Sequence, residues 1–314
     1  MEERQDNHAR PARTTRAVAA VALAALFGAA ACGELAPQSA AQSAAGRQTS
    51  PAPPTPTPTV QAASETLPAP GEPIPQDAAG LAAALKRTSA ALDAAIDAWP
   101  KTGKPPQNVE LLALHEQRIY RYAARHPKLA AQAFARLPAP LAAEAKDNTA
   151  AIRGLLSLAH PVKPSATFKV QAPRPAAELL GHFKKAERRF GVEWEVLAAV
   201  MFAETKFGRV KSDSHTGAQG PMQFMPGTWK AYGMGGDVQD PRDAVMAAAN
   251  YLRASGAPRD YRRALYAYNH SQAYVNAILL HARQIKRDPR NYYAYYNWQV
   301  FVITTAGERR LTGP

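Results

Sequence analysis

A long proline-rich stretch near the N-terminal end is the feature that most constrains how this chain can fold. Many of the 27 prolines lie in a segment that alternates proline with alanine and threonine, in the style of SPAPPTPTPTV. Such a segment offers too little apolar surface for a core and favours extended, polyproline-like backbone. We therefore predict a Pro/Ala/Thr-rich disordered linker over residues 32–76, with the folded part of the chain beginning at residue 77.

The residues ahead of this linker have the composition of a secretory signal peptide. Arginines up to Arg16 precede an apolar run over residues 17–27, and small residues follow at positions 28–31. The apolar run is too short to cross a bilayer comfortably as a helix. We predict a signal peptide over residues 1–31, and hence an exported, extracytoplasmic protein.

Cys32, the only cysteine of the sequence, follows directly. Small residues running into a cysteine resemble a bacterial lipobox, in which Cys32 becomes the lipidated first residue and anchors the chain to the membrane. Ala29 departs from that pattern, because a large aliphatic residue is usual there. The alternative is ordinary cleavage after Ala31, which leaves a free thiol. The expected location is the outer face of the cytoplasmic membrane or the cell wall, and a lone cysteine excludes an internal disulfide.

The formal net charge of +13 indicates an anionic partner or surface. For an exported chain, this favours anionic wall polymers or lipid headgroups over nucleic acid. The alternative is a generally basic proteome. No phosphate-binding loop, nucleic-acid motif or metal-ligand spacing occurs, so neither metal nor cofactor is predicted.

Apolar residues recur at helical spacing over most of the chain after residue 77. We predict a small helical module of unknown role over residues 77–160, with helices near 108–125, 128–137 and 140–158 after a first one that Pro100 ends. A short linker over residues 161–175 separates it from a second helical domain. The histidines of the helical module, His115, His126 and His160, are predicted to be structural or surface residues.

Within the second domain, a helix over residues 192–206 carries a carboxylate among apolar residues. Leu197, Val200, Met201 and Glu204 stand at i, i+3, i+4 and i+7 and share one face. If this face is buried, the pKa of Glu204 should be raised, as a general acid near neutral pH requires. The alternative is a glutamate at a frayed helix end, turned towards Lys206 or Arg209.

A glycine-bracketed loop follows at residues 214–226. Gly217 and Gly220 allow the backbone to approach a ligand closely, while Gln223 offers an amide and its neighbours offer apolar surface. A tight turn between helices would also explain the glycines. Further on, the sequence Asp-Pro-Arg-Asp at residues 240–243 predicts a helix start capped by Asp240.

Three short motifs together resemble those of the lytic transglycosylases with a goose-type lysozyme-like fold and an SLT-like domain. They are Glu204-Thr205, the segment Gly-Pro-Met-Gln at 220–223, and Ala-Tyr-Asn at 267–269, where the family reads Glu-Ser, Gly-Leu-Met-Gln and Ala-Tyr-Asn. The resemblance covers residues 176–290. It implies a mainly α fold, with a lysozyme-like helical catalytic domain after the helical module.

The resemblance implies cleavage of the β-1,4 bond between N-acetylmuramic acid and N-acetylglucosamine in peptidoglycan strands. Glu204 would protonate the leaving oxygen and then act as base on the C6 hydroxyl, leaving a 1,6-anhydro end. Ordinary glycosidases need a second carboxylate, and Asp213 is the candidate for one. The alternatives are a hydrolytic muramidase on the same fold and a catalytically silent wall-binding lipoprotein.

The same resemblance assigns roles around Glu204. The Thr205 hydroxyl should orient the carboxylate of Glu204, and Tyr268 should form a hydrogen bond near it. The side chains of Met222 and Gln223 should line the sugar subsites. The implied substrate-binding residues are Thr205, Ser214, Met222, Gln223, Tyr268 and Asn269.

Two departures from the family pattern alter the surroundings of these residues. Pro221 replaces an aliphatic residue and removes one backbone N–H, so no main-chain donor exists there. His270 and Ser271 follow the third motif where the family usually has Ala-Gly.

The last residues, 291–314, form an aromatic C-terminal tail in which residues 299–305 read as a strand. Its aromatic side chains predict either packing against the helical domain or a platform for sugar rings.

Overall fold

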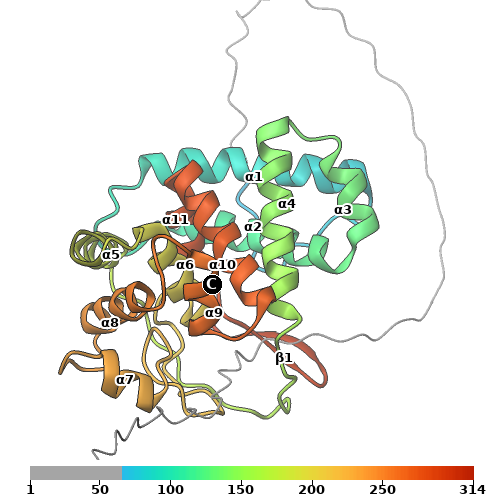
Figure 1. The fold of residues 1–314 in the computed structure, drawn as a ribbon. Helices are drawn as coiled ribbons and strands as arrows, with labels where there is room; N and C mark the ends of the chain where they lie inside the picture. Colours follow the sequence, from blue (N-terminus) through green and yellow to red (C-terminus); the bar gives the residue numbers. More distant parts are fainter. Residues whose placement is uncertain (1–65) are drawn as a thin grey trace, which may run out of the picture.

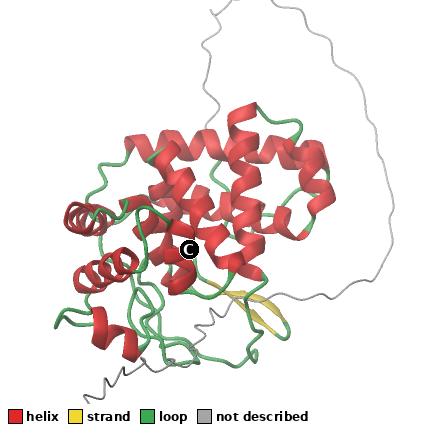
Figure 2. Ribbon diagram, viewed as in Figure 1, coloured by secondary structure: helices red, strands yellow, loops and turns green. Residues whose placement is uncertain are grey.

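The computed structural model describes residues 66–314, which form a mainly helical body (Figure 1). Among these residues there are eleven helices and one two-stranded hairpin (Figure 2). The mainly α fold is the one predicted. The predicted signal peptide, Cys32 and most of the linker over 32–76 lie outside the described residues.

The N-terminal helices agree closely with the predicted ones. Asp77 caps the first, since its side chain accepts a hydrogen bond of 2.7 Å from the backbone of Gly80. Pro127 and Pro140 stand in the first turns of the third and fourth, where a missing N–H costs nothing. The elements are α1 (Ala78–Ala98), α2 (Gln107–Arg125), α3 (Pro127–Phe134) and α4 (Ala139–Leu156).

The remaining elements follow the same rules. Asp240 caps its helix as predicted, with its carboxylate accepting from the backbone N–H groups of Arg242 and Asp243. The elements are α5 (Ala176–Phe190), α6 (Trp194–Thr205), α7 (Pro226–Tyr232), α8 (Pro241–Ala254), α9 (Tyr261–Tyr268), α10 (Gln272–Arg287), α11 (Arg290–Asn297), β1 (Phe301–Thr304) and β2 (Gly307–Arg310).

Helix α6 lies at the centre of the body and is packed by α5, α8, α10 and α11. Residues 196–203 are all buried, so the helix has no polar face along this stretch. This differs from the single apolar face predicted around Leu197 and Val200. A helix that is apolar all round is one enclosed on every side, and Glu204 is therefore a carboxylate near the end of a core helix.

The predicted helical module, residues 77–160, is not set apart from the rest. Helix α4 runs along α10, and α1 and α2 pack on α11. Gly154 lies at a close contact of these helices, because a Cβ there would lie 3.1 Å from the carbonyl oxygen of Ala273. The aromatic tail joins the same core: Trp99 meets Tyr293 edge-on at 5.7 Å, and Tyr295 Oη donates to Asn148 Oδ1 at 2.5 Å. The tail therefore packs inside the body rather than forming an open platform.

The chain after α11 forms an antiparallel hairpin of β1 and β2, with Phe301 opposite Arg310. The predicted strand at 299–305 thus contains β1. A buried amide pair fastens the hairpin to α2: Gln117 Nε2 donates to the Gln299 carbonyl at 2.9 Å, and the Gln299 N–H donates to Gln117 Oε1 at 2.8 Å. Arg125 adds a 2.7 Å ion pair to Glu308.

The ends of the two predicted linkers also contact the body. The Glu72 carbonyl accepts from Arg118 Nη1 at 2.6 Å, and Val162 forms a parallel bridge with Thr304. Within residues 66–314, no helix combines the length and the apolar character that a membrane crossing needs.

The amide pair yields a stability prediction. Replacing Gln117 by alanine leaves the N–H and C=O of Gln299 buried without partners, and each such group costs about 1–3 kcal/mol. We expect Gln117→Ala to lower the free energy of unfolding by roughly 2–4 kcal/mol, measured as a lower urea midpoint. The matched control is Gln132→Ala, an exposed glutamine on α3, and equal losses in the two variants would contradict the prediction.

Candidate functional site

Glu204 opens onto a pocket of about 240 Å³ built from three stretches of chain. The end of α6 and the following turn supply Ala203 to Lys206 together with Val210. The loop of the second motif supplies residues 212–215, Ala218 and Gln223. The third stretch comes from residues on either side of the family-like region: His160, Pro161, Val162 and Phe168, with Val300, Phe301 and Val302.

The chain turns sharply where α6 ends. Lys206, Phe207 and Gly208 have φ angles of 52°, 59° and 82°, so three successive residues are left-handed. Non-glycine residues rarely adopt this conformation, and such strain is concentrated at functional sites. The turn begins directly after Thr205 and sets Glu204 at the pocket.

The Glu204 carboxyl is held by a tyrosine. Tyr274, on α10, donates a hydrogen bond of 2.6 Å from its hydroxyl to Glu204 Oε1. Burial raises the pKa of Glu204 from 4.5 to about 7, while the Tyr274 hydrogen bond and the charge of Lys206 lower it. Near neutral pH the carboxyl can therefore either give or accept a proton, which a general acid and base must do.

The two cations beside Glu204 are directed elsewhere. Lys206 Nζ donates to the Phe202 carbonyl at 3.0 Å and lies 4.0 Å from the centre of the Phe202 ring. Burial lowers the pKa of Lys206 to about 7. Arg209 lies over Tyr296 and donates to the Lys206 carbonyl. This geometry disfavours the interpretation of Glu204 as an exposed glutamate paired with Lys206 or Arg209.

Thr205 serves a different purpose from the one the family resemblance implies. Its buried hydroxyl donates to the Pro221 carbonyl at 2.7 Å and accepts from the Gly208 N–H at 2.9 Å. These bonds join the end of α6 to the loop of the second motif. Thr205 therefore fixes the backbone around Glu204, and its hydroxyl bonds to backbone groups instead of to the carboxyl.

The loop itself is folded by hydrogen bonds. Ser214 Oγ accepts from the Ala218 N–H at 2.9 Å and lines the pocket, while Gln219 and Phe224 form an antiparallel bridge. A Cβ on Gly220, whose φ is 72°, would lie 1.9 Å from the Val238 carbonyl oxygen. The packing of the protein's own backbone therefore requires a glycine there, which fits the tight turn that was the alternative explanation of the glycines.

The two predicted sugar-facing residues of the second motif, Met222 and Gln223, lie in different places. Gln223 lines the pocket with a left-handed φ of 50°, and its amide donates to the Gly220 carbonyl at 3.0 Å. The Met222 side chain is fully buried in the core and does not line the pocket, contrary to expectation. Only its carbonyl is engaged, as the acceptor for Tyr268 Oη at 2.7 Å.

The third motif contacts the loop of the second motif more than it contacts the Glu204 carboxyl. Tyr268 packs on Phe224 and Tyr251, at 5.9 and 5.6 Å between ring centres. The nearby charge of Glu204 helps to raise the pKa of Tyr268, although burial is the larger cause. Asn269 is buried and ends α9. The tyrosine that bonds Glu204 is Tyr274, which the sequence interpretation missed; the available signal was a hydroxyl in the first turn of the helix capped by Ser271.

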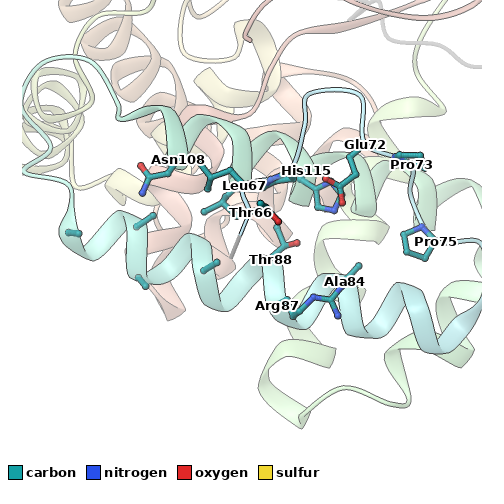
Figure 3. A pocket seen from close by; sticks show the side chains of 16 residues that line it. Thr66, Leu67, Glu72, Pro73, Pro75, Ala84, Arg87, Thr88, Asn108 and His115 are labelled. Atoms are coloured by element: carbon teal, nitrogen blue, oxygen red, sulfur yellow. The ribbon is translucent and has the colours of Figure 1, made fainter. Parts of the chain in front are cut away.

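Asp213 lines the pocket but is exposed, and its contact is a 3.5 Å hydrogen bond from Gln219. No three His, Cys, Asp or Glu side chains among residues 66–314 gather as a metal site requires. A second cavity, of about 680 Å³, lies between residues 66–75 and helices α1 and α2 (Figure 3). None of the predicted site residues lines it.

Comparisons with known proteins fit this geometry. Residues 181–288 match the family model described as Transglycosylase SLT domain. The chain is also similar to the membrane-bound lytic murein transglycosylase F of Thiobacillus denitrificans (strain ATCC 25259 / T1), with 27% identity over 129 residues. That alignment covers 38% of this chain and 27% of the relative, so the chain matches about a quarter of the relative's length. No solved structure matches significantly.

The family-matched range contains Glu204, the loop of the second motif, Tyr268 and Tyr274. It excludes α1 to α4, α11 and the hairpin. Within its larger helical body, this chain therefore contains an SLT-like domain of the lytic transglycosylase type.

Proposed function

We propose that this protein is a peptidoglycan lytic transglycosylase in which Glu204 is the catalytic acid and base. The observation that carries the proposal is the Glu204 carboxyl, whose pKa is raised to about 7 and which lines a pocket at the SLT-like domain. The relative's name, a lytic murein transglycosylase, supports the same substrate.

The proposed reaction uses one carboxyl twice. Protonated Glu204 donates its proton to the glycosidic oxygen as the bond between the muramic C1 and that oxygen breaks. The resulting carboxylate then removes the proton of the C6 hydroxyl of the same muramic residue, and that oxygen forms the new bond to C1. The product is a 1,6-anhydro end, water is not consumed, and Glu204 regains its starting proton. Tyr274 holds Glu204 Oε1 throughout.

The rival reaction is hydrolysis by a muramidase, which uses a second carboxylate to activate water or to form a glycosyl intermediate. Asp213 is the other carboxylate that lines the pocket. Its exposure and its contact with Gln219 favour a role in the loop. A silent wall-binding protein is the third possibility, and a carboxyl with a pKa near 7 beside a tyrosine is not needed for binding alone.

The proposed location is extracytoplasmic, at the peptidoglycan. The relative is named membrane-bound, and the sequence of residues 1–31 supports export. Lipidation of Cys32 is our proposal for the anchor. With it, the Pro/Ala/Thr-rich linker would set how far the helical body reaches from the membrane.

The two carboxylates of the pocket should respond differently to substitution. Glu204→Gln keeps the shape of the side chain but removes its proton chemistry, so the release of soluble muropeptides should fall by about 10²–10⁴-fold. Asp213→Asn should retain activity within a few-fold. Mass spectrometry of digested peptidoglycan should show 1,6-anhydro ends. Reducing ends, together with an inactive Asp213→Asn, would establish hydrolysis instead.

The proposed reaction should depend on pH. A general acid must be protonated, so kcat/KM should fall as pH rises through about 7, the raised pKa of Glu204. The Tyr274 hydrogen bond stabilises the carboxylate and lowers that pKa. Tyr274→Phe should therefore move the falling limb to higher pH.

The matched control is Tyr266→Phe, an exposed tyrosine on α9, which should leave the limb in place. The measurement is a pH profile of muropeptide release for the three proteins. A limb that stays fixed in Tyr274→Phe, or that moves equally in the control, would refute the role given to Tyr274.

A further inference from the structure

One side of the Glu204 pocket is made by segments that the family match does not include. Residues 160–168 and 300–302, which we call the wall, contribute His160, Val162, Phe168 and three residues at β1 to the lining. Both segments lie outside the matched range, 181–288. The family resemblance therefore does not account for this side of the pocket.

The wall is held by backbone pairing as well as by side chains. The Val162 N–H donates to the Ile303 carbonyl at 3.0 Å, and the Thr305 N–H donates to the Val162 carbonyl at 2.9 Å. The predicted linker thus lies along β1 as an additional extended segment. Arg309 Nη1, from β2, donates to the Pro164 carbonyl at 2.7 Å. These bonds join the two segments into one surface.

Helix α2 fixes this surface to the rest of the body. The amide pair between Gln117 and Gln299 lies directly before Val300, and Glu308 of β2 pairs with Arg121 and Arg125. The Gln117 and Arg121 side chains are almost fully buried. A surface attached in this way is a fixed boundary of the pocket.

The wall also contacts the loop of the second motif. His160, from the wall, and His215, from the loop of the second motif, contact each other edge-on, with ring centres 6.0 Å apart and planes at 77°. Rings at this separation and angle are in direct contact, so a sugar ring cannot pass between them. Both histidines are exposed and both line the pocket.

The size of the pocket agrees with a closed end. Its volume of about 240 Å³ falls below the range of about 300–1,000 Å³ that is common for pockets holding drug-sized ligands. A volume of this size holds a short piece of a glycan. The apolar residues Phe168, Val300 and Val302 suit the apolar faces and acetyl methyl groups of such a piece.

We propose that the wall closes one end of the glycan-binding site, so that the enzyme cuts at the terminus of a glycan strand and not within it. The inference rests on the proposed transglycosylase function. The wall residues, with the His160–His215 contact, would then determine the length of the fragment released.

The test is a time course of soluble products from purified peptidoglycan, separated by chromatography and identified by mass. Terminal cleavage predicts that anhydro-disaccharide muropeptides dominate from the earliest samples. Longer oligosaccharides at early times would overturn the inference and leave the proposed function standing. The absence of any anhydro product from the wild-type protein would instead remove the proposed function.

Two variants test the wall itself. His160→Ala and His215→Ala each remove one half of the contact, and their exposed positions make loss of folding a small risk. Each should raise the early fraction of longer oligosaccharides several-fold relative to total cleavage. His126→Ala, at the exposed junction of α2 and α3, is the matched control and should keep the wild-type distribution. An unchanged distribution in both pocket variants would show that the wall does not set the product length.

Discussion

Removing one carboxyl from water is the physical event on which the proposed chemistry depends. The shift of the Glu204 pKa from 4.5 to about 7 corresponds to about 3 kcal/mol against its charged form. Tyr274 and Lys206 both favour the charged form, yet desolvation outweighs them. That balance exists because α6 is enclosed by four other helices, so the packing of the whole body sets the protonation of one side chain.

A raised pKa alone does not identify a catalytic group in this protein. Burial also raises the pKa of Glu116 to about 8 and that of Glu144 to about 7. Glu116 accepts hydrogen bonds from Ser89 and Trp298, and neither acid lines the Glu204 pocket. What distinguishes Glu204 is the combination of a tuned carboxyl, a pocket beside it and a strained turn after it.

The sequence predicted the features that local rules control. Helix spans, the Asp240 cap and the three motifs depend on residues a few positions apart, and the structure contains the predicted helices within a few residues of their bounds. Long-range contacts were beyond such rules. Tyr274 reaches Glu204 across 70 positions, and Thr205 turns to Pro221 because the loop folds back on the helix end. The role of residues 161–175 could not be foreseen, because a proline-rich segment looks like a linker until its pairing partner at β1 is known.

The pairing of Val162 with β1 also has a consequence for how the protein is made. Nearly all the other residues that form the pocket are synthesised well before residues 300–304, and the pocket lacks one side until those residues have emerged. Contacts between segments so far apart in sequence form late and slowly, because the chain between them must first be ordered. The emerging chain would therefore contain Glu204 and the three motifs before the pocket was complete. The proposed selectivity for glycan ends would be the last property to be acquired.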